Sequence, residues 1–403
     1  MSQKENVYKA NSYLYVQDDE ESTIFIVKSG EVSFSCYNEE FKRNRKNAKP
    51  GDIFGFISAL SNRPRTESAI AVTDAKVLEL SKDTFFSLLQ KNSEIAIKII
   101  NYFAEELRAL DNLIISNRDT DIEPYNQKLF NLGKHFYNIN EFQCAYYVLF
   151  RFIQLYPSDK QKSEAKEMIN KMESFGLRSI PEPIKRDGTL LFTDGQIIFC
   201  ENEPGEELFF IKQGKIKIIK TNKETDIMLS ILHQGEIFGE LAIVSEKPRN
   251  ATALSYGKSV LVPIKKESLI SLMHRSPDIL INIITAISHR VWFSYIRQES
   301  KLYKHPLTRL YSFLENKLLE DHISLKDAAT HTFQFSIDDL LKMCGIPQDK
   351  MNALMEDLLS DENLNFNFGQ IVIHDSSQIS AKAKYHKSRD KLYDDSSDEE
   401  TIN

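Results

Sequence analysis

The sequence predicts an α+β multidomain protein: two β-rolls of the double-stranded β-helix (jelly-roll) type, an α-helical hairpin joining them, and a winged-helix-like C-terminal module. Three observations support this. Residues 51–56 (GDIFGF) and 235–240 (GEIFGE) repeat at an offset of 184. In both copies, short runs of Ile, Phe and Val alternate with polar residues and are broken by glycines, which is typical of antiparallel strands in a sandwich or roll. Residues 122–174 lack strand patterns and predict helices.

The repeat extends well beyond one motif. The same offset maps Gly30 onto Gly214, Pro64-Arg65 onto Pro248-Arg249, and DTFFSLL (83–89) onto ESLISLM (267–273). One offset held over so long a stretch indicates two homologous modules. We place them at residues 8–118 and 186–303.

A helix is predicted at the end of each module. Its apolar positions alternate in spacing between four and three residues, as in a coiled-coil seam. They are Ala96, Ile100, Phe103, Leu107, Leu110 and Ile114 in the first module, and Leu280, Ile284, Ile287, Val291 and Ser294 in the second. A helix packed on its own roll gives the same stripe. We favour pairing of helix with helix, either between chains in a homodimer or between the two modules.

The segment at 122–174 resembles one tetratricopeptide (TPR) helical hairpin. The matching positions are Leu132-Gly133, Phe136, Ala145, Leu149 and Pro157, and a third helix at about 160–174 would cap the hairpin. Two interpretations stay open, a helical spacer and a binding site for a protein partner. Residues 176–188, with Pro181 and Pro183, predict a linker.

Residues 304–375 predict a helix-turn-helix with a wing: a helix at 336–344, a second helix ending near Leu359, and a hairpin. Eight acidic residues and two lysines between 337 and 375 give a net charge of −6, which opposes binding to DNA phosphates. Gln348 and Asn352 are able to read adenine edges. We nevertheless expect that this module binds DNA weakly or not at all, and that it contacts other proteins instead. The tail, 376–403, is basic and then acidic, and predicts disorder.

Composition narrows the function classes. The chain has 403 residues, a net charge of −7 and four widely separated cysteines, with no disulfide or metal spacing. Its start is polar and no long apolar run is present, so we expect a cytoplasmic protein without a membrane segment. The sequence has no P-loop, GxSxG or HExxH motif, so we expect no enzyme and no metal site.

The segment 238–252, FGELAIVSEKPRNAT, has the chemistry of a site for a compact anion with a hydroxyl beside it. The carboxylate of Glu240 accepts a hydrogen bond from a hydroxyl, and Arg249 offers a planar fork of donors to an anion. Gly239 lets the backbone come close. The amides of Leu241, Asn250 and Ala251 are the further donors.

This segment resembles the phosphate-binding cassette, FGELA…PRxAT, of the cyclic-nucleotide-binding domains in Crp/Fnr regulators and kinase regulatory subunits. The match runs from Phe238 to Thr252. The resemblance implies that Glu240 binds the ribose 2′-hydroxyl and Arg249 the phosphate of a cyclic nucleotide: cAMP, cGMP or a cyclic dinucleotide. It also implies that the helix at 276–300 caps the base, with Arg290 and Ser294 at the base contacts. The alternative is a structural Glu–Arg salt bridge in a fold that has lost its ligand.

The first module departs from the cassette. Its segment 54–68, FGFISALSNRPRTES, keeps Arg65, but Phe56 replaces the carboxylate and Glu67 replaces a small residue. We expect an empty, structural first module, with a different ligand as the alternative. Three functions follow: a nucleotide sensor that signals through the helix to the C-terminal module and protein partners, a nucleotide-dependent DNA-binding transcription regulator, and a scaffold with a dead site.

Overall fold

The structure is a computed structural model that describes residues 3–36, 46–115, 123–177, 182–221, 226–268, 277–321, 323–346, 348–367 and 369–398. The chain forms two compact units. Met1–Thr225 and Ser230–Tyr295 make the first, and Asp226–Leu229 and Ile296–Asn403 make the second. The first unit holds the first predicted module, the helical segment after it, and the second predicted module except Asp226–Leu229 and the residues after Tyr295. The boundary after Tyr295 falls inside helix α10 (Pro277–Ser300), a little before the end that the sequence predicts for the second module.

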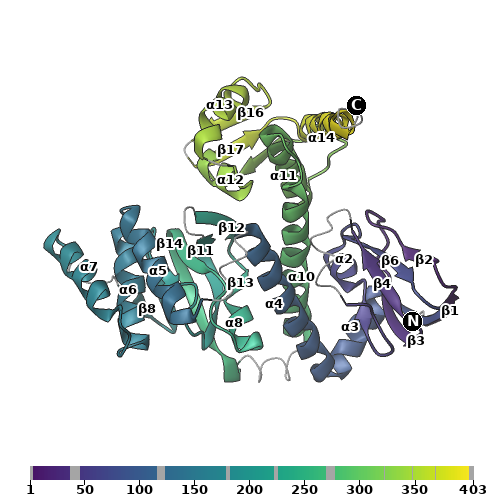
Figure 1. Ribbon diagram of the computed structural model, residues 1–403, viewed down its shortest axis with the longest axis horizontal. Helices are drawn as coiled ribbons and strands as arrows, with labels where there is room; N and C mark the ends of the chain where they lie inside the picture. The colour runs from purple at the N-terminus through teal and green to yellow at the C-terminus, as the bar shows by residue number, and fades with distance from the viewer. Residues whose placement is uncertain are drawn as a thin grey trace. The chain divides into compact units, whose positions relative to one another are not determined.

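The first module is a roll of two antiparallel sheets, with strand orders β1-β7-β3-β5 and β2-β6-β4 (Figure 1). Apolar side chains alternate inward along these strands and meet in one core around Phe25, Val27 and Phe54. Its elements are β1 (Gln3–Tyr8), β2 (Tyr13–Tyr15), β3 (Ile24–Ser29), β4 (Val32–Ser35), β5 (Ile53–Phe54), α2 (Phe56–Ser61), β6 (Ser68–Ala71), β7 (Ala75–Leu80), α3 (Lys82–Lys91) and α4 (Ser93–Ile115).

The second module repeats this plan in a sheet of order β12-β11-β14-β9-β8, with β10 on β14 and β13 on β11. Its long strands β11 and β14 cover, at the offset of 184, the positions of β3 with β4 and of β6 with β7. Its elements are β8 (Ile184–Arg186), β9 (Thr189–Phe192), β10 (Ile197–Phe199), β11 (Glu207–Thr221), β12 (Asp226–Leu232), β13 (Ile237–Phe238), α8 (Glu240–Ser245), β14 (Thr252–Lys265) and α10.

Strand register confirms the repeat. Phe25 pairs with Phe54 in the first module, and Phe209 pairs with Phe238 in the second, each 184 positions on. One expectation for the chain between the modules is wrong. Strand β8 lies within the predicted linker and pairs with β9. Pro183 stands just before β8, where its missing N–H costs no ladder hydrogen bond.

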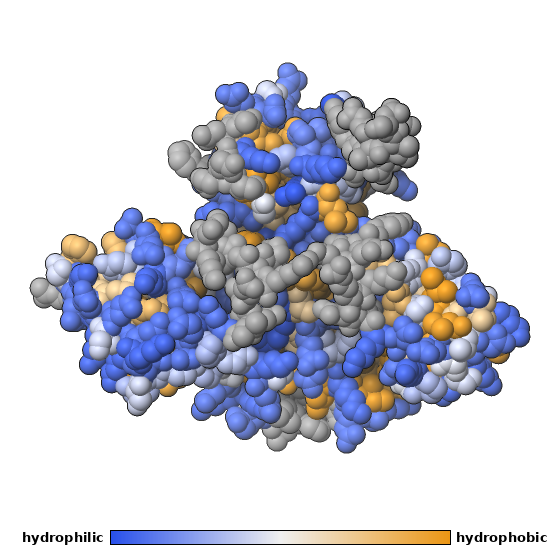
Figure 2. All heavy atoms as spheres, viewed as in Figure 1, coloured by the Kyte–Doolittle hydropathy of each residue, from blue (hydrophilic) through white to orange (hydrophobic). Residues whose placement is uncertain are grey.

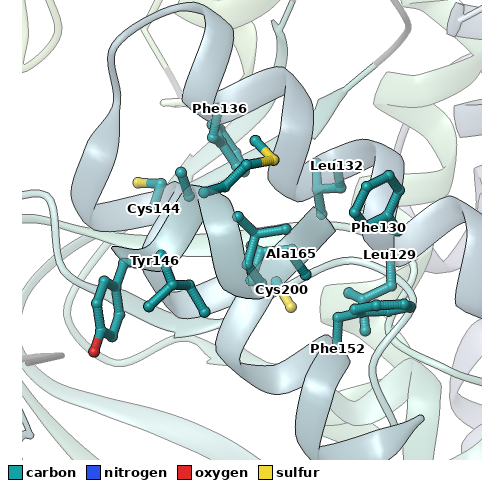
Figure 3. Close-up of a cluster of buried hydrophobic side chains, with 14 of the residues drawn as sticks. Leu129, Phe130, Leu132, Phe136, Cys144, Tyr146, Phe152, Ala165 and Cys200 are labelled. Atoms are coloured by element: carbon teal, nitrogen blue, oxygen red, sulfur yellow. The ribbon is translucent and has the colours of Figure 1, made fainter. Parts of the chain in front are cut away.

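The segment between the modules consists of three helices, as predicted: α5 (Tyr125–Asn138), α6 (Phe142–Leu155) and α7 (Lys162–Ser174). Their apolar faces form a shared core, into which Cys200 of the second module also points (Figure 3). Ile197, Ile219 and Leu254 of that module join the same cluster. These three helices, named here the helical segment, are therefore packed on the second module. Their outer surface is mostly hydrophilic with small apolar groups between (Figure 2).

The helices that end the modules, α4 and α10, contact the opposite module within the same chain. Trp292 Nε1 of α10 donates to Pro64 O in the first module (2.9 Å), and Arg108 Nη2 of α4 donates to Pro248 O in the second (2.8 Å). Both the donors and the acceptors are 184 positions apart, so the contact is reciprocal. Helix α4 lies beside α10 (Figure 1), and Tyr295 of α10 donates a hydrogen bond to Glu106 of α4.

The predicted stripes are buried, in part against the helix's own module, since Phe103 of α4 packs on Phe56. Ile100, Phe103 and Leu107 of α4 are at most 4% exposed, and Ile284, Ile287 and Val291 of α10 are fully buried. The side chain of Ile114 lies outside the described residues. Of the arrangements left open by the sequence, the structure therefore combines packing of the helix on its own module with contacts to the other module of the same chain. The apolar stripes that suggested a homodimer are already covered without one.

Helix α10 contains a stretch, Ile279–Ser300, that is long and apolar enough to cross a membrane by length and composition alone. The expectation of no long apolar run is therefore wrong for this helix. It has 22 residues, a mean hydropathy of 1.3, and a most apolar window that is 44% buried. A core helix meets the same criterion, and the first part of α10 packs inside the first unit.

The second unit contains α11 (Pro306–Glu320), β15 (His331–Phe333), α12 (Ile337–Met343), α13 (Gln348–Leu359), β16 (Leu364–Asn367), β17 (Gln370–Ile373) and α14 (Ser376–Asp398). Its strands form a sheet of order β15-β17-β16. Pro306 opens α11, and a capping box of Ser336 and Asp339 opens α12. The two predicted helices and the hairpin are present. The side chains of Gln348, Asp349 and Asn352 lie outside the described residues.

The disorder predicted for the tail is wrong for residues 376–398, which form α14. Ile379 and Ala383 lie one turn apart on this helix and are fully buried. Lys382 Nζ pairs with Asp361 (2.5 Å), and Lys387 Nζ pairs with Glu315 of α11 (2.9 Å). The charged composition that suggested disorder supplies these ion pairs, and the two buried side chains supply the apolar contact.

Candidate functional site

The candidate site lies where β13 turns into the short helix α8. Gly239 caps α8 in the left-handed region (φ +81°, ψ 0°), a conformation that costs glycine little. Gly55 caps α2 of the first module in the same way (φ 75°, ψ 3°). The cassette turn is thus built identically in both modules, and their differences lie in the side chains.

Arg249 is buried against the cassette turn. Nη1 donates to Gly239 O and Nη2 to Glu207 O, both at 2.7 Å, and the guanidinium stacks on the Phe199 ring with 4.1 Å to its centroid. Gly205 makes room for it, because a Cβ there would lie 2.5 Å from Cζ and Nε of Arg249. Burial lowers the pKa of Arg249, although the carboxylates of Glu203, Glu207 and Glu240 oppose that shift. The guanidinium remains charged.

Arg65 of the first module makes the same set of contacts. It donates to Gly55 O and Thr23 O, both at 2.6 Å, and lies 4.2 Å from the centroid of the Tyr15 ring. Each partner is 184 positions before the corresponding partner of Arg249. Holding the turn through two carbonyls is therefore a structural task that both arginines perform, and it does not by itself mark a ligand site.

Glu240 is what distinguishes the second module. Its side chain is fully buried at the start of α8, and its Oε1 lies 2.9 Å from Nη2 of Arg290 on α10. Glu240 is thus ion-paired with Arg290. The salt bridge between Glu240 and Arg249 that the sequence left as an alternative is not the pairing found. Neither carboxylate oxygen of Glu240, nor Nε of Arg249, has a hydrogen bond of good geometry within the described part of the chain.

Comparison with known proteins identifies the family of the domain that contains this turn. Residues 5–92 and 189–276 each match the family model described as "Cyclic nucleotide-binding domain". The chain thus contains two copies of this domain. The matched ranges contain both cassettes, and we refer below to the first and second cyclic nucleotide-binding domains.

The relatives are distant. The chain is 22% identical to a cAMP-dependent protein kinase regulatory subunit of Dictyostelium discoideum, over 65% of this chain and 63% of that protein. It is 21% identical to a cyclic AMP receptor protein of Thermus thermophilus, over 47% of this chain and 85% of that one. A solved regulatory domain of Toxoplasma gondii PKA with cAMP is 20% identical, with 70% of this chain and 84% of that chain covered and a TM-score of 0.22. The chain thus spans less than two thirds of the first relative's length.

The other predicted ligand residues lie around the same turn with different partners. Leu241 is in the first turn of α8, and Ala251 is buried just after Arg249. The Asn250 side chain donates to Asp111 of α4 (2.6 Å) in the first domain. Arg290 faces Glu240. Ser294 is half-buried one turn further along α10.

Sequence reasoning missed Lys220, at the end of β11. Its side chain is buried, donates to Asn250 O (2.6 Å) and pairs with Glu201 (3.0 Å), so it holds the chain just after Arg249. Strand alternation places Lys220 on the same face as the buried Ile216, and a lysine at an inward position was the available signal. The sequence offers no comparable pattern for Gly205 and Glu203, because both residues lie in an irregular loop without strand alternation.

The first domain fills the equivalent space with side chains. Phe56 is buried in edge-to-face contact with Tyr102 and Phe103 of α4. Glu67 is also buried and accepts a hydrogen bond from Tyr15 (3.3 Å). The carboxylate expected to oppose a phosphate thus lies inside the domain, and an aromatic ring occupies the position of Glu240.

Proposed function

We propose that the second domain binds a cyclic nucleotide, with Arg249 at the phosphate and Glu240 at the ribose 2′-hydroxyl, and that the chain is a regulatory protein rather than a catalyst. One observation carries the proposal. Both oxygens of Glu240 and Nε of Arg249 are buried without a hydrogen bond from the described residues. Oε1 of Glu240 has the ion pair with Arg290, but Oε2 and the Arg249 Nε have no partner among the described residues, and buried polar atoms left unpaired are costly.

The chemistry of the two groups fits such a ligand. A guanidinium has five N–H donors. Arg249 uses two of them on the carbonyls of Gly239 and Glu207, so others remain for a phosphate oxygen. The carboxylate of Glu240 is an acceptor for a ribose hydroxyl. Its ion pair with Arg290 links that end of the site to α10, so a ligand that competes for Glu240 alters the hold of α10 on the domain.

The first domain serves as a structural partner in this proposal. Phe56 offers no acceptor to a ribose hydroxyl. Arg65 makes the same two carbonyl bonds as Arg249, and its Nε, like that of Arg249, is buried without a hydrogen bond from the described residues, so the difference between the domains rests on Phe56 and not on the arginine. The names of the relatives favour cAMP as the ligand. The same two side chains also suit cGMP, and a cyclic dinucleotide is the third candidate.

For the output of the regulator we propose contact with protein partners, through the second unit and the TPR-like helical segment. The order of elements in the second unit is that of a winged helix, but its net charge of −6 over 337–375 disfavours DNA. Two tail lysines that could attract phosphates, Lys382 and Lys387, are paired with Asp361 and Glu315. We place the protein in the cytoplasm.

Calorimetry of the intact chain tests the binding proposal. Titration with cAMP, cGMP and cyclic di-GMP should show one of them binding, at one equivalent per chain. Two equivalents would contradict the structural role of the first domain. Absence of heat and of any thermal stabilisation with all three would instead support a scaffold with a dead site.

A nucleotide-dependent transcription regulator is the second candidate, and the order of elements in the second unit favours it. A mobility-shift assay on genomic fragments, with and without nucleotide, at about 150 mM salt separates the two outputs, because nonspecific complexes are weak there. We expect no sequence-selective complex. A nanomolar, nucleotide-dependent and selective complex would establish the transcription regulator.

A further inference from the structure

We propose that the helical segment is a positioning element for the second nucleotide site, and that Arg151 on α6 acts through Glu203 to hold Arg249 in place. The inference rests on the proposed function, since it concerns the arginine assigned to the phosphate. It assigns a role in nucleotide affinity to residues outside both cyclic nucleotide-binding domains.

The first step is the loop that carries Glu203. The main chain of this loop is bonded to the main chain of Arg249 on both sides. Arg249 N donates to Glu203 O (2.8 Å), and Asn202 N donates to Arg249 O (2.9 Å). The position of the Arg249 peptide is therefore set by the loop at residues 202–203.

The second step is the Glu203 side chain, which the helical segment holds. Its Oε2 accepts from Arg151 Nε (3.0 Å), and its Oε1 accepts from the Cys200 amide (3.1 Å) and from the Tyr147 hydroxyl (3.4 Å). The side chain is 5% exposed, so it depends on these partners. A buried carboxylate that loses its cation is strongly destabilised. Loss of Arg151 therefore acts first on this loop.

The third step is that the loop and the helical segment share one core. Cys200, three residues before Glu203, points into the cluster formed by α5, α6 and α7 (Figure 3). The loop is thus held by an apolar contact at Cys200 and by an ion pair at Glu203, both with the helical segment. Each contact lies within four residues of the main-chain bonds to Arg249.

The first domain provides an internal comparison. Its equivalent loop bonds to Arg65 in the same way: Arg65 N donates to Asp19 O, and Asp18 N donates to Arg65 O, both at 2.9 Å. There the carboxylate of Asp19, 184 positions before Glu203, accepts from the Val16 amide of its own loop (2.8 Å) and is half-exposed. In the second domain, the carboxylate of this loop is therefore bound by a side chain of the helical segment. In the first domain, the carboxylate of the equivalent loop is bound only by an amide of its own loop among the contacts described.

The test compares Arg151→Gln with Lys134→Gln in the full chain. Lys134 makes an exposed ion pair with Glu164 in the same helical segment (2.9 Å), so it controls for loss of a charge there. With cAMP as the probe, Arg151→Gln should weaken binding roughly fivefold, since such indirect couplings are worth about 0.5–2 kcal/mol. Lys134→Gln should bind like the wild type. Arg151→Lys should recover part of the loss, because it restores the charge without the planar fork.

Hydrogen exchange without nucleotide supplies the local readout. The amides of Asn202 and Arg249 should exchange faster in Arg151→Gln and at the wild-type rate in Lys134→Gln. Wild-type exchange and wild-type cAMP affinity in Arg151→Gln would overturn the inference while leaving the proposed function standing. Failure of the wild type to bind any cyclic nucleotide would overturn the proposed function, and unchanged exchange in the variant would then overturn the positioning role as well. If Arg151→Gln fails to fold, Glu203→Gln removes the same ion pair from the other side and is subject to the same outcomes.

Discussion

Arg65 and Arg249 hold equivalent turns through equivalent contacts, and the residue after each turn glycine decides what the turn can bind. In the first domain that residue is Phe56, which packs on two aromatic rings of α4. In the second it is Glu240, a buried carboxylate facing Arg290. Together with buried Glu67, which stands where the second domain has Ala251, Phe56 thus makes the lining of the first cassette differ from that of the second.

At this scale we predict that Glu240→Gln and removal of the ligand's 2′-hydroxyl have the same, non-additive effect. Each should cost about 1–3 kcal/mol of binding free energy, because each removes one hydrogen bond to a charged group. The measurement is calorimetry of wild type and Glu240→Gln with cAMP and with 2′-deoxy-cAMP. If the two losses simply add, Glu240 does not bind that hydroxyl.

Much of the site was readable from the sequence because the cassette is local. Gly239, Glu240 and Arg249 lie within eleven positions of one another, and the structure places them on one turn. The pairing of Glu240 with Arg290 was not readable, since α10 meets α8 only after the chain has folded. Lys220, Glu203 and Asp111 were missed for the same reason, as each reaches the cassette from a distant strand, loop or helix.

At the scale of elements, α14 shows how a polar sequence becomes an ordered helix. Its docking depends on a few contacts: buried Ile379 and Ala383, and the pairs of Lys382 with Asp361 and Lys387 with Glu315. Asp361 also accepts a hydrogen bond from Tyr311 of α11 (2.5 Å). Ser376, Ser380 and His386 add further contacts. Composition averages over such contacts, so it predicted disorder where specific positions give order.

We predict that Asp361→Asn loosens α14. Burial alone raises the pKa of Asp361, but the hydrogen bonds from Lys382 and Tyr311 outweigh it and hold that pKa below its ordinary value. A carboxyl with a lowered folded-state pKa stabilises above its unfolded pKa of about 4, and this contribution is lost as the pH falls through the folded value. The variant should lose about 2 kcal/mol of unfolding free energy at pH 7.

Urea unfolding and limited proteolysis of α14 provide the check, with Lys384→Gln as the control because Lys384 is exposed on the same helix. The wild type should approach the variant in stability as the pH falls well below 4. Equal protease resistance of Asp361→Asn and wild type at pH 7 would show that α14 is held by other contacts.

At the scale of the whole molecule, the first unit is built as a pair of domains that hold each other through reciprocal helices. The repeat and the two apolar stripes were visible in the sequence, and with them the alternative of pairing inside one chain. The reciprocal contacts were not visible, because Arg108 and Pro248 are 140 positions apart and no local pattern connects them.

The chain's single tryptophan reports on this arrangement. Trp292 is buried and bonded to Pro64 of the first domain, and it lies two positions from Arg290. We predict that a cyclic nucleotide binding at Glu240 changes the emission of Trp292, because the ion pair that fixes this part of α10 is altered. Fluorescence titration should give the same affinity as calorimetry. Unchanged emission at saturating nucleotide would mean that α10 does not respond to the site.

The most direct test of the account is a comparison of Arg249→Leu with Arg65→Leu by calorimetry and thermal unfolding. Both variants lose two bonds to carbonyls and a close aromatic contact, so their thermal stabilities should fall by similar amounts. Only Arg249→Leu should lose nucleotide affinity, by about 3 kcal/mol or roughly a hundredfold, because only it removes the cation at the phosphate. Wild-type affinity in Arg249→Leu, or an equal loss in Arg65→Leu, would contradict the assignment of the ligand to the second domain.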